Sequence, residues 1–205
     1  MTNKPLVEAQ NILFEKGGRT IFSSVNMILN QGDIVLVKGK NGSGKTSFLK
    51  CLAGFYNIKK GTILWGGQEI LPAFVAEKNM LAWLGHLNAV KPSLTVKENL
   101  QFYADLWSIT KSDFDYSVNY LSFSQYLEFP VSWLSAGEKR RLCLIRLMFS
   151  PSKVWFLDEP TTFLDKENKT IFENIMQKHI SKDGAIVCAT HDNFNIKDFK
   201  TLNLD

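Results

Sequence analysis

The sequence has few of the features that mark secreted, membrane-spanning or disordered proteins. It contains only three cysteines, Cys51, Cys143 and Cys188, and no two of them form a CxxC pair. This pattern supports neither a disulfide framework nor a zinc site, and it indicates a reducing compartment. No apolar run approaches the roughly 18 residues that a membrane span needs. The segment Met1–Pro5 also lacks the apolar stretch of a signal peptide.

The chain is neither strongly acidic nor strongly basic. There are 24 Lys and Arg against 20 Asp and Glu, which gives a net charge of +4. This charge suits an anionic ligand but is too small to indicate nucleic-acid binding by itself. Hydrophobic residues make up 45% and charged residues 21% of the chain, as in ordinary globular proteins. Its 205 residues are enough for one domain with a sizeable core and few for two, so a single domain is predicted over residues 1–205.

Strands and helices are predicted to alternate along the chain. Strands are expected over residues 6–13, 21–29, 34–37, 62–65, 154–157 and 185–189. Helices are expected over residues 46–52, 95–106, 135–149 and 166–180, with helical sequence continuing to about residue 127 after the second. Three of the strands are short continuous apolar runs, which is typical of buried parallel strands. The pattern predicts an α/β fold with a helical insertion over about residues 80–145.

The strongest motif is a glycine-rich loop between a predicted strand and a predicted helix, with the complete GxxxxGK[ST] pattern. It consists of Gly39, Lys40, Asn41, Gly42, Ser43, Gly44, Lys45 and Thr46. Glycines let consecutive N–H groups point at phosphate oxygens, and the helix N-terminus adds partial positive charge. Lys45 is expected to reach the β- and γ-phosphates of a nucleotide, and the Thr46 hydroxyl to bind Mg²⁺. A glycine-rich turn without a ligand is the weaker alternative.

A second motif places two acidic residues directly after a buried strand. The apolar run Val154–Leu157 is followed by Asp158 and Glu159. In α/β sheets, ligands bind at the carboxyl ends of the strands. Asp158 is therefore expected to hold Mg²⁺ through water, and Glu159 to act as the general base that polarises an attacking water. The alternative is an acidic strand end that caps the following helix.

Two further features each have a structural and a functional interpretation. Ser135 and Glu138 form a capping-box pattern, which caps a helix but also marks a helix N-terminus able to bind an anion. His191 follows the apolar run 185–189, where a lone histidine is usually a hydrogen-bonded structural residue. The order of the motifs along the chain favours the functional interpretation of both.

In this order the motifs resemble those of the ATP-binding cassette (ABC) family. Gly39–Thr46 is similar to the Walker A motif, Leu134–Glu138 to the signature and Val154–Glu159 to Walker B. Thr162–Asp165 resembles the D-loop, and His191 the switch histidine. The resemblance covers nearly the whole chain. It implies a P-loop NTPase cassette with a RecA-like core, an antiparallel β edge and a helical subdomain, hydrolysing ATP with Mg²⁺.

The resemblance also implies how the site is completed. In the family, the signature helix of one subunit faces the ATP that the other subunit's P-loop holds. Carried over, Ser135 and Gly137 would contact the γ-phosphate across a head-to-tail homodimer with two ATP molecules. His191 would contact the γ-phosphate within its own subunit.

Several positions depart from the family pattern. His86 occupies the register of a glutamine that binds Mg²⁺ and links the cassette to its membrane partner, so His86 is a candidate metal ligand. Lys16 stands where an aromatic residue usually stacks on adenine. Ala136 and Glu138 replace the usual Gly and Gln of the signature.

The chain resembles one branch of the family in its short length, in its Leu-Ser-Ala-Gly signature and in the residues Gly85, His86 and Lys91. That branch is the cytochrome c maturation ATPases, the ATP-binding subunits of haem exporters. The resemblance implies a role in c-type cytochrome biogenesis with an integral membrane permease of the CcmB type. It also implies a peripheral location on the cytoplasmic face of the inner membrane and no nucleic-acid partner.

Two other functions stay open on the residues alone. One is a soluble ABC ATPase that acts on a non-membrane partner. The other is a nucleotide-gated module with little turnover. The transported substrate is open as well, because the sequence has neither a Cys-Pro nor a paired-histidine haem site.

Overall fold

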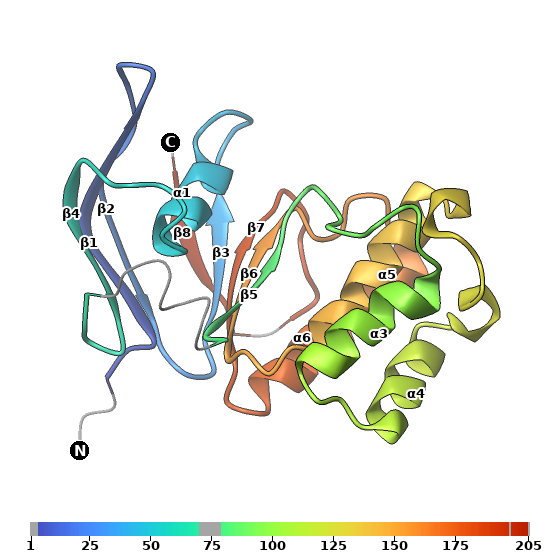
Figure 1. The fold of residues 1–205 in the computed structure, drawn as a ribbon. Coiled ribbons are helices and arrows are strands. Elements are labelled where there is room, and N and C mark those ends of the chain that lie inside the picture. Colours follow the sequence, from blue (N-terminus) through green and yellow to red (C-terminus); the bar gives the residue numbers. More distant parts are fainter. Residues whose placement is uncertain (1–3, 70–78, 197, 205) are drawn as a thin grey trace. The chain divides into compact units, whose positions relative to one another are not determined.

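The computed structural model describes residues 4–69, 79–196 and 198–204 (Figure 1). The ends of the predicted domain, residues 1–3 and 205, lie outside the described part of the chain. The chain divides into two compact units. A core unit comprises Met1–Trp83, Ser152–Pro160 and Met176–Asp205, and a helical unit comprises Leu84–Pro151 and Thr161–Ile175. No helix in the described residues is both long and apolar enough to cross a membrane.

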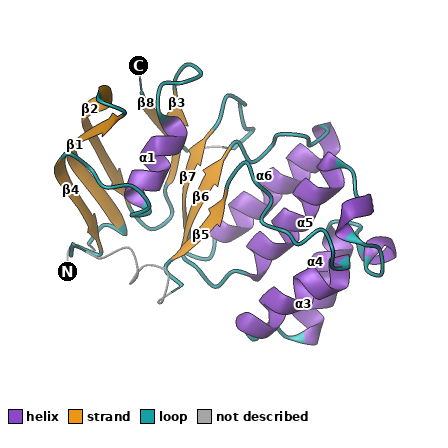
Figure 2. Cartoon of the chain, turned by 45° about the horizontal axis from the view of Figure 1, so that its top comes forward, coloured by secondary structure: helices purple, strands orange, loops and turns teal. Residues whose placement is uncertain are grey.

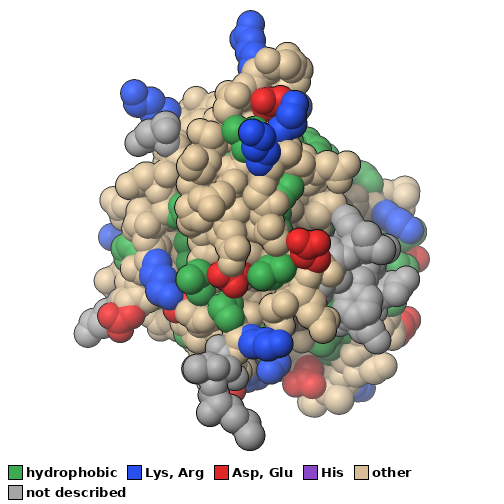
Figure 3. All heavy atoms as spheres, turned by 90° about the vertical axis from the view of Figure 1, so that its left-hand side faces the viewer, with side chains coloured by type: hydrophobic (Ala, Val, Ile, Leu, Met, Phe, Trp, Pro, Cys, Tyr) green, Lys and Arg blue, Asp and Glu red, His purple; other side chains and the backbone are tan. Residues whose placement is uncertain are grey.

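The core unit contains an antiparallel sheet with strand order β2-β1-β4. The strands are β1 (Val7–Lys16), β2 (Arg19–Leu29) and β4 (Lys60–Trp65). Gly17 and Gly18 join β1 to β2 with positive φ angles of 58° and 75°, which glycine adopts without steric cost. On the face of the molecule shown in Figure 3, basic, acidic and apolar side chains are interspersed over the described residues.

A parallel sheet with strand order β5-β6-β7-β3-β8 forms the rest of the core unit's β structure. Its strands are β3 (Ile34–Lys38), β5 (Leu81–Leu84), β6 (Val154–Asp158), β7 (Ala185–Ala189) and β8 (Lys200–Asn203). Every residue of β6 and β7 is buried, as their continuous apolar sequences predict. Helix α1 (Lys45–Leu52) lies between the two sheets, where Phe48 and Leu49 are fully buried (Figures 1 and 2).

The helical unit is built on α3 (Val96–Leu106), α4 (Lys111–Tyr120), α5 (Ala136–Phe149) and the first part of α6 (Lys166–Ile180). Helix α5 packs against α3 and α4. Both α3 and α5 begin with a complete capping box. At Thr95 and Ser135 the side chain accepts a hydrogen bond from the third helical residue, whose glutamate reaches back to the cap.

The α/β class and the antiparallel edge are confirmed, whereas one prediction about the middle of the chain is wrong. Residues 81–84 form the edge strand β5, ahead of the helices of the insertion, and the helical sequence does not run on to residue 127. It ends at Tyr120 and is followed by a 3₁₀ turn over Ser124–Tyr126. The prediction also lacked β8, at the opposite edge of the sheet.

Candidate functional site

The candidate site residues of the core unit lie at or directly after the carboxyl ends of three adjacent strands. Strand β3 leads into the glycine-rich loop, β6 ends at Asp158, and β7 leads to His191. Asp158 is paired with Ala189, and Ala189 with Val37, so the three strand ends lie side by side. This is the edge at which α/β proteins bind ligands.

The N-terminus of α1 is left open to an anion. All residues of α1 are described, and this helix has neither a side-chain cap nor an acidic residue in its first turn. In contrast, α3 and α5 each have a side-chain cap and a glutamate in the first turn. The first N–H groups of a helix have no intrahelical partner, so an uncapped end favours a negatively charged ligand.

Two glycines of the loop stand where a side chain cannot fit. A Cβ at Gly39 would meet the Ser43 Oγ and the Leu204 carbonyl oxygen. Gly44 has a φ of 97°, and its Cβ would lie 2.5 Å from the Ile21 Cγ2. The Ser43 Oγ is buried without a hydrogen-bond partner among the described residues. Buried polar groups are rarely left unpaired, so this orphan atom fits a loop made to receive a phosphate group.

The Lys45 ammonium group contacts two carbonyl oxygens of the loop and the His191 ring. Its Nζ lies 2.9 Å from the Gly39 carbonyl oxygen, 3.1 Å from that of Lys40 and 3.0 Å from the His191 Nε2. Lys45 is 8% exposed. Because a lysine ammonium only donates, the His191 Nε2 is the acceptor in a hydrogen bond between the two groups. Phosphate oxygens would form stronger, charge-assisted bonds with the same ammonium.

Thr46 and Asp158 are brought together across 112 positions of sequence. The Thr46 Oγ1 lies 2.9 Å from both carboxylate oxygens of Asp158. A hydroxyl next to a carboxylate is a set of hard oxygen donors, and Mg²⁺ is usually held by one or two such groups together with phosphates and water. These two residues therefore fit the magnesium ion that the ABC resemblance implies.

Glu159 lies beside His191 in a strained backbone conformation. Its φ is 48°, in the left-handed region that non-glycine residues rarely occupy, and its N–H donates to the Ala189 carbonyl oxygen at 2.8 Å. Strained residues of this kind cluster at functional sites. The Glu159 Oε1 is 3.6 Å from the His191 Nε2, and the Glu159 side chain is 19% exposed. The carboxylate is thus reachable by water and lies next to the candidate phosphate site.

Sequence reasoning missed Lys38 in this site. Its Nζ donates to the Asp192 carbonyl oxygen at 2.6 Å and so ties the last residue of β3 to the segment that carries His191. The Asp192 N–H in turn donates to the Thr190 Oγ1 at 3.0 Å. The available signal was a basic residue at the carboxyl end of a buried strand, directly before Gly39.

Ser135, Gly137 and His86 belong to the helical unit, and their predicted roles remain predictions. The Ser135 N–H donates to the Glu138 Oε2 at 2.7 Å, and this bond lowers the pKa of the Glu138 carboxyl. A Cβ at Gly137 would lie 2.9 Å from the Phe163 carbonyl oxygen. His86 is exposed. Within the described residues, no group of three or more His, Cys, Asp and Glu side chains is placed to hold a metal.

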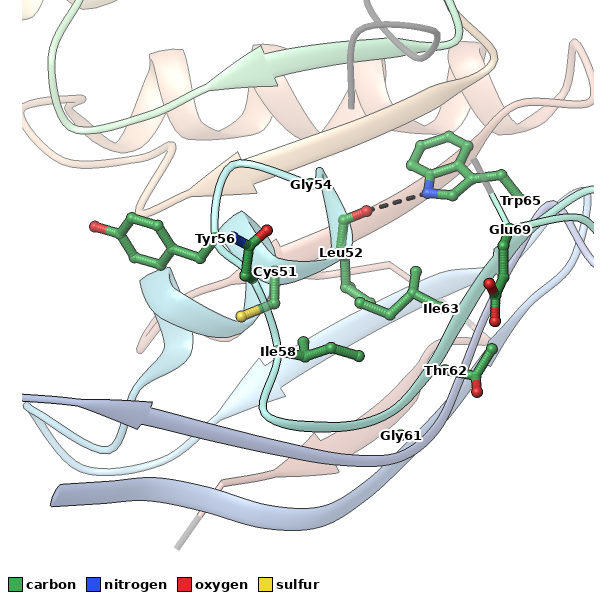
Figure 4. A pocket seen from close by; sticks show the side chains of 11 residues that line it. Cys51, Leu52, Gly54, Tyr56, Ile58, Gly61, Thr62, Ile63, Trp65 and Glu69 are labelled. Carbon is green, nitrogen blue, oxygen red and sulfur yellow. Dashed lines mark hydrogen bonds between the residues drawn. The ribbon is translucent and has the colours of Figure 1, made fainter. Parts of the chain in front are cut away.

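A separate pocket of about 270 Å³ lies at the other end of α1 (Figure 4). Its lining includes Cys51, Leu52, Ile63 and Trp65. The Trp65 Nε1 donates to the Leu52 carbonyl oxygen at 3.1 Å. Because the pocket faces the C-terminal end of the helix, it is distinct from the loop around Lys45.

Known proteins are similar to this chain in sequence and in fold. The family described as "ABC transporter" matches residues 22–162. The cytochrome c biogenesis ATP-binding export protein CcmA of Chelativorans sp. is 38% identical over 89% of this chain and 90% of its own length. The protein of the same name from Paramagnetospirillum magneticum is 36% identical over 96% of this chain and 93% of its own.

Solved structures show the same fold. An ABC transporter ATP-binding protein from Pyrococcus furiosus superposes with a TM-score of 0.82 at 20% identity, covering 97% of this chain and 96% of its own. The ATP-binding subunit of another ABC transporter gives a TM-score of 0.81 at 18% identity, covering 91% and 79%. The chain therefore belongs to the ABC transporter family, as an ATP-binding subunit that resembles the CcmA proteins.

Proposed function

We propose that this chain is the ATP-hydrolysing, energy-coupling subunit of an inner-membrane ABC transporter complex in c-type cytochrome biogenesis. The observation that carries the proposal is the set of contacts around Lys45, where the glycine-rich loop and His191 meet. The relatives in Chelativorans and Paramagnetospirillum are named cytochrome c biogenesis ATP-binding export proteins, which supports a role in this pathway.

Each residue of the site has a role in this proposal. Residues 39–46 wrap the phosphates of ATP, and Lys45 exchanges its loop carbonyls for the β- and γ-phosphate oxygens. Thr46 and Asp158 hold Mg²⁺, which supplies charge neutralisation at the phosphates. Glu159 takes the proton of the attacking water, and His191 contacts the γ-phosphate once Lys45 has turned to the nucleotide.

The proposal extends to the assembly. Two copies would bind head to tail, with Ser135 and Gly137 of each copy completing the site of the other. An integral membrane permease of the CcmB type would hold the pair as peripheral subunits on the cytoplasmic face of the inner membrane. The basis for this part is the family resemblance and the open, uncapped phosphate site of the single chain.

The test is complementation in the source organism with the gene deleted. The wild-type gene should restore covalent haem in c-type cytochromes, measured by haem-stained gels of membranes. Lys45→Ala should not restore it, because the phosphate site loses its central charge. Lys59→Ala is the matched control, since the exposed Lys59 ammonium pairs with Glu15 and lies outside the loop.

Three outcomes would contradict the proposal. Normal cytochromes in the deletion strain would remove the chain from this pathway. Full rescue by Lys45→Ala would show that ATP binding at this loop is not required. Purified chain that binds ATP but shows no turnover, even in its membrane complex, would favour the nucleotide-gated module instead.

A further inference from the structure

Trp133 is a large aromatic side chain on the surface of the helical unit. It is 74% exposed, although tryptophan is highly buried on average in folded proteins. The Phe129 ring, 43% exposed, lies beside it with centroids 6.0 Å apart and an interplanar angle of 64°. Exposed apolar patches mark interaction sites more often than single side chains do. Most of the indole surface is therefore open to a ligand.

The backbone that carries Trp133 is fixed by buried neighbours. It forms the last residue of a 3₁₀ turn over Val131–Trp133. Val131 is fully buried, and its N–H donates to the Leu94 carbonyl oxygen at 3.0 Å. On the other side, Leu134 is only 4% exposed. The indole is thus displayed from an ordered turn, and a group held in this way loses less entropy when it binds.

Trp133 lies two residues before Ser135, the N-cap of α5. Leu134 between them is extended, with a ψ of 141°. Two extended residues span about 7 Å, and the indole itself reaches further. In the proposed homodimer, Ser135 meets the γ-phosphate of the ATP that the other copy holds. Trp133 would then lie within reach of the ribose and base of that same nucleotide.

Within the described residues, the aromatic rings of the core unit nearest the phosphate loop are already packed. Phe14 and Phe22 are 5% and 7% exposed. Tyr56 stacks on Phe14 with centroids 5.5 Å apart and an interplanar angle of 3°. The Nζ atoms of Lys16 and Lys50 lie 5.5 Å and 5.2 Å from the centroid of the Tyr56 ring. None of these rings offers a free face to a nucleotide base.

The exposed aromatic residues of the core unit lie away from the phosphate loop. Among the residues that the structure describes, they are Phe55 and Phe199. Phe55 follows the C-terminal end of α1, whereas the phosphate loop leads into its N-terminal end. Phe199 precedes β8, which runs parallel to β3, so it lies at the opposite edge of the sheet from the loop. In the described part of the chain, a ring that stacks on the base has to come from outside the core unit.

We infer that the Trp133 indole of one copy stacks on the adenine of the ATP that the other copy's phosphate loop holds. This inference rests on the proposed function. Stacking needs only an aromatic face on each side, and it adds affinity without a hydrogen-bond pattern. Trp133 thereby supplies the aromatic contact that Lys16 lacks. The base then stabilises the assembled pair and adds little to ATP binding by a single copy.

The first test uses the purified chain with Glu159→Gln and measures its dimer by light scattering. Trp133→Ala should raise the Mg²⁺-ATP concentration that gives half of the dimer at least about tenfold, because the base loses its stacking partner. Trp133→Phe keeps a ring and should stay within about threefold of the parent. Phe102→Ala is the matched control. Phe102 is 55% exposed on α3 and contacts Tyr103 rather than the turn, so its loss should change nothing.

The second test asks which copy supplies the ring. At protein concentrations too low for the dimer, Trp133→Ala should bind Mg²⁺-ATP as tightly as the parent does, measured by equilibrium dialysis. Weaker binding by the single copy would place the indole against its own nucleotide and overturn the inference.

Photolabelling locates the base directly. An azido derivative of the adenine in ATP, irradiated in the Glu159→Gln dimer, should label the peptide that contains Trp133, identified by mass spectrometry. The same peptide should stay unlabelled in the dilute single copy. A dimer labelled only in peptides of the core unit would overturn the inference.

The outcomes separate this inference from the proposed function. If Mg²⁺-ATP produces no dimer of the Glu159→Gln chain, the shared site fails and the stacking contact fails with it. If the dimer forms equally well with Trp133→Ala, only the stacking contact is refuted. If Trp133 is labelled but the wild-type gene restores no cytochromes, the contact stands and the cytochrome pathway is refuted.

Discussion

At the scale of single residues, the His191 Nε2 can serve only one neighbour at a time. It accepts a hydrogen bond from Lys45 at 3.0 Å, and the Glu159 carboxylate lies 3.6 Å away. A carboxylate only accepts, so a bond to Glu159 would need a proton on this nitrogen and would end the bond from Lys45. In the proposed function Lys45 turns to phosphate oxygens, which would release the Nε2. The proposal therefore predicts that the partners of these three side chains change together on nucleotide binding.

Replacing Glu159 by glutamine tests the general base. The amide keeps the shape of the side chain but cannot accept a proton from water. Turnover of ATP should fall by about 10²–10⁴, the usual contribution of a general base. Binding of Mg²⁺-ATP, measured by calorimetry, should persist because Lys45, Thr46 and Asp158 are untouched. Normal turnover would remove Glu159 from catalysis.

His179 gives the core unit a pH-dependent stability. Its ring stacks on Trp155 with centroids 3.7 Å apart, and its Nε2 lies 3.0 Å from the Lys153 carbonyl oxygen. A Cβ at Gly184 would fall on this ring, so the site needs glycine there. Burial lowers the pKa of His179 to about 4. The folded chain thus keeps a neutral imidazole at pH values where the unfolded chain is already protonated.

The sign follows from the protons bound in each state. Between about pH 6.5 and pH 4 the unfolded state binds one more proton at this position, so stability falls as the pH is lowered. The loss should be about 1–2 kcal/mol after allowance for the solvent-facing part of the ring. Urea unfolding at pH 7.5 and pH 5 measures it, and His179→Phe should flatten this part of the profile. An equal slope in both proteins would refute the assignment.

At the scale of elements, the sequence predicted the strands and helices that carry a strong local pattern. Strands β6 and β7 are continuous apolar runs, and the helices with capping boxes begin where those boxes predict. The two missed strands, β5 and β8, are the edges of the parallel sheet. In β8 only Leu202 is even partly buried, so its sequence carries little apolar signal. Edge strands are specified by their neighbour in the sheet rather than by their own pattern.

In the candidate site, too, only the residues with a local sequence pattern could be predicted. Lys45, Thr46, Asp158 and Glu159 could be selected as candidate site residues because each lies in a local motif. The contact of Lys38 with Asp192 could not, since 154 positions separate the two residues and no local rule joins them. Only the parallel pairing of β3 with β7 brings these strand ends together.

Two glycines of the phosphate loop give a matched test of its geometry. Gly42 and Gly44 both have positive φ angles, 85° and 97°. A Cβ at Gly42 meets nothing within 4 Å, whereas at Gly44 it meets the Ile21 and Phe22 side chains. Gly42→Ala should cost about 1–2 kcal/mol of unfolding free energy from backbone strain. Gly44→Ala should cost a further 1–3 kcal/mol or so from overpacking, by urea denaturation without nucleotide. Equal losses would show that the loop relaxes around the added methyl group.

At the scale of the whole molecule, the phosphate site and the signature helix belong to different compact units of one chain. In the proposed function, the phosphate loop, the Thr46–Asp158 pair that would hold Mg²⁺ and the general base Glu159 all belong to the core unit. The Ser135 end of α5 already has a complete cap, so the helical unit does not need a ligand for its own stability. In the proposed homodimer, Ser135 of one copy would reach the nucleotide held by the other copy, so its contribution would be measured in the assembled state.

Ser135 and Thr95 allow this contribution to be separated from helix capping. Both are N-cap residues of capping boxes, on α5 and α3 respectively, and each hydroxyl accepts from the third helical N–H at 3.2 Å and 3.1 Å. Ser135→Ala and Thr95→Ala should each lower the free energy of unfolding by about 1 kcal/mol. In a Glu159→Gln background, Mg²⁺-ATP should double the mass measured by light scattering, because unhydrolysed ATP joins two subunits. Adding Ser135→Ala should abolish this dimer, whereas adding Thr95→Ala should leave it intact. Loss of the dimer in both would assign the effect to helix stability, and a dimer in both would remove Ser135 from the shared site.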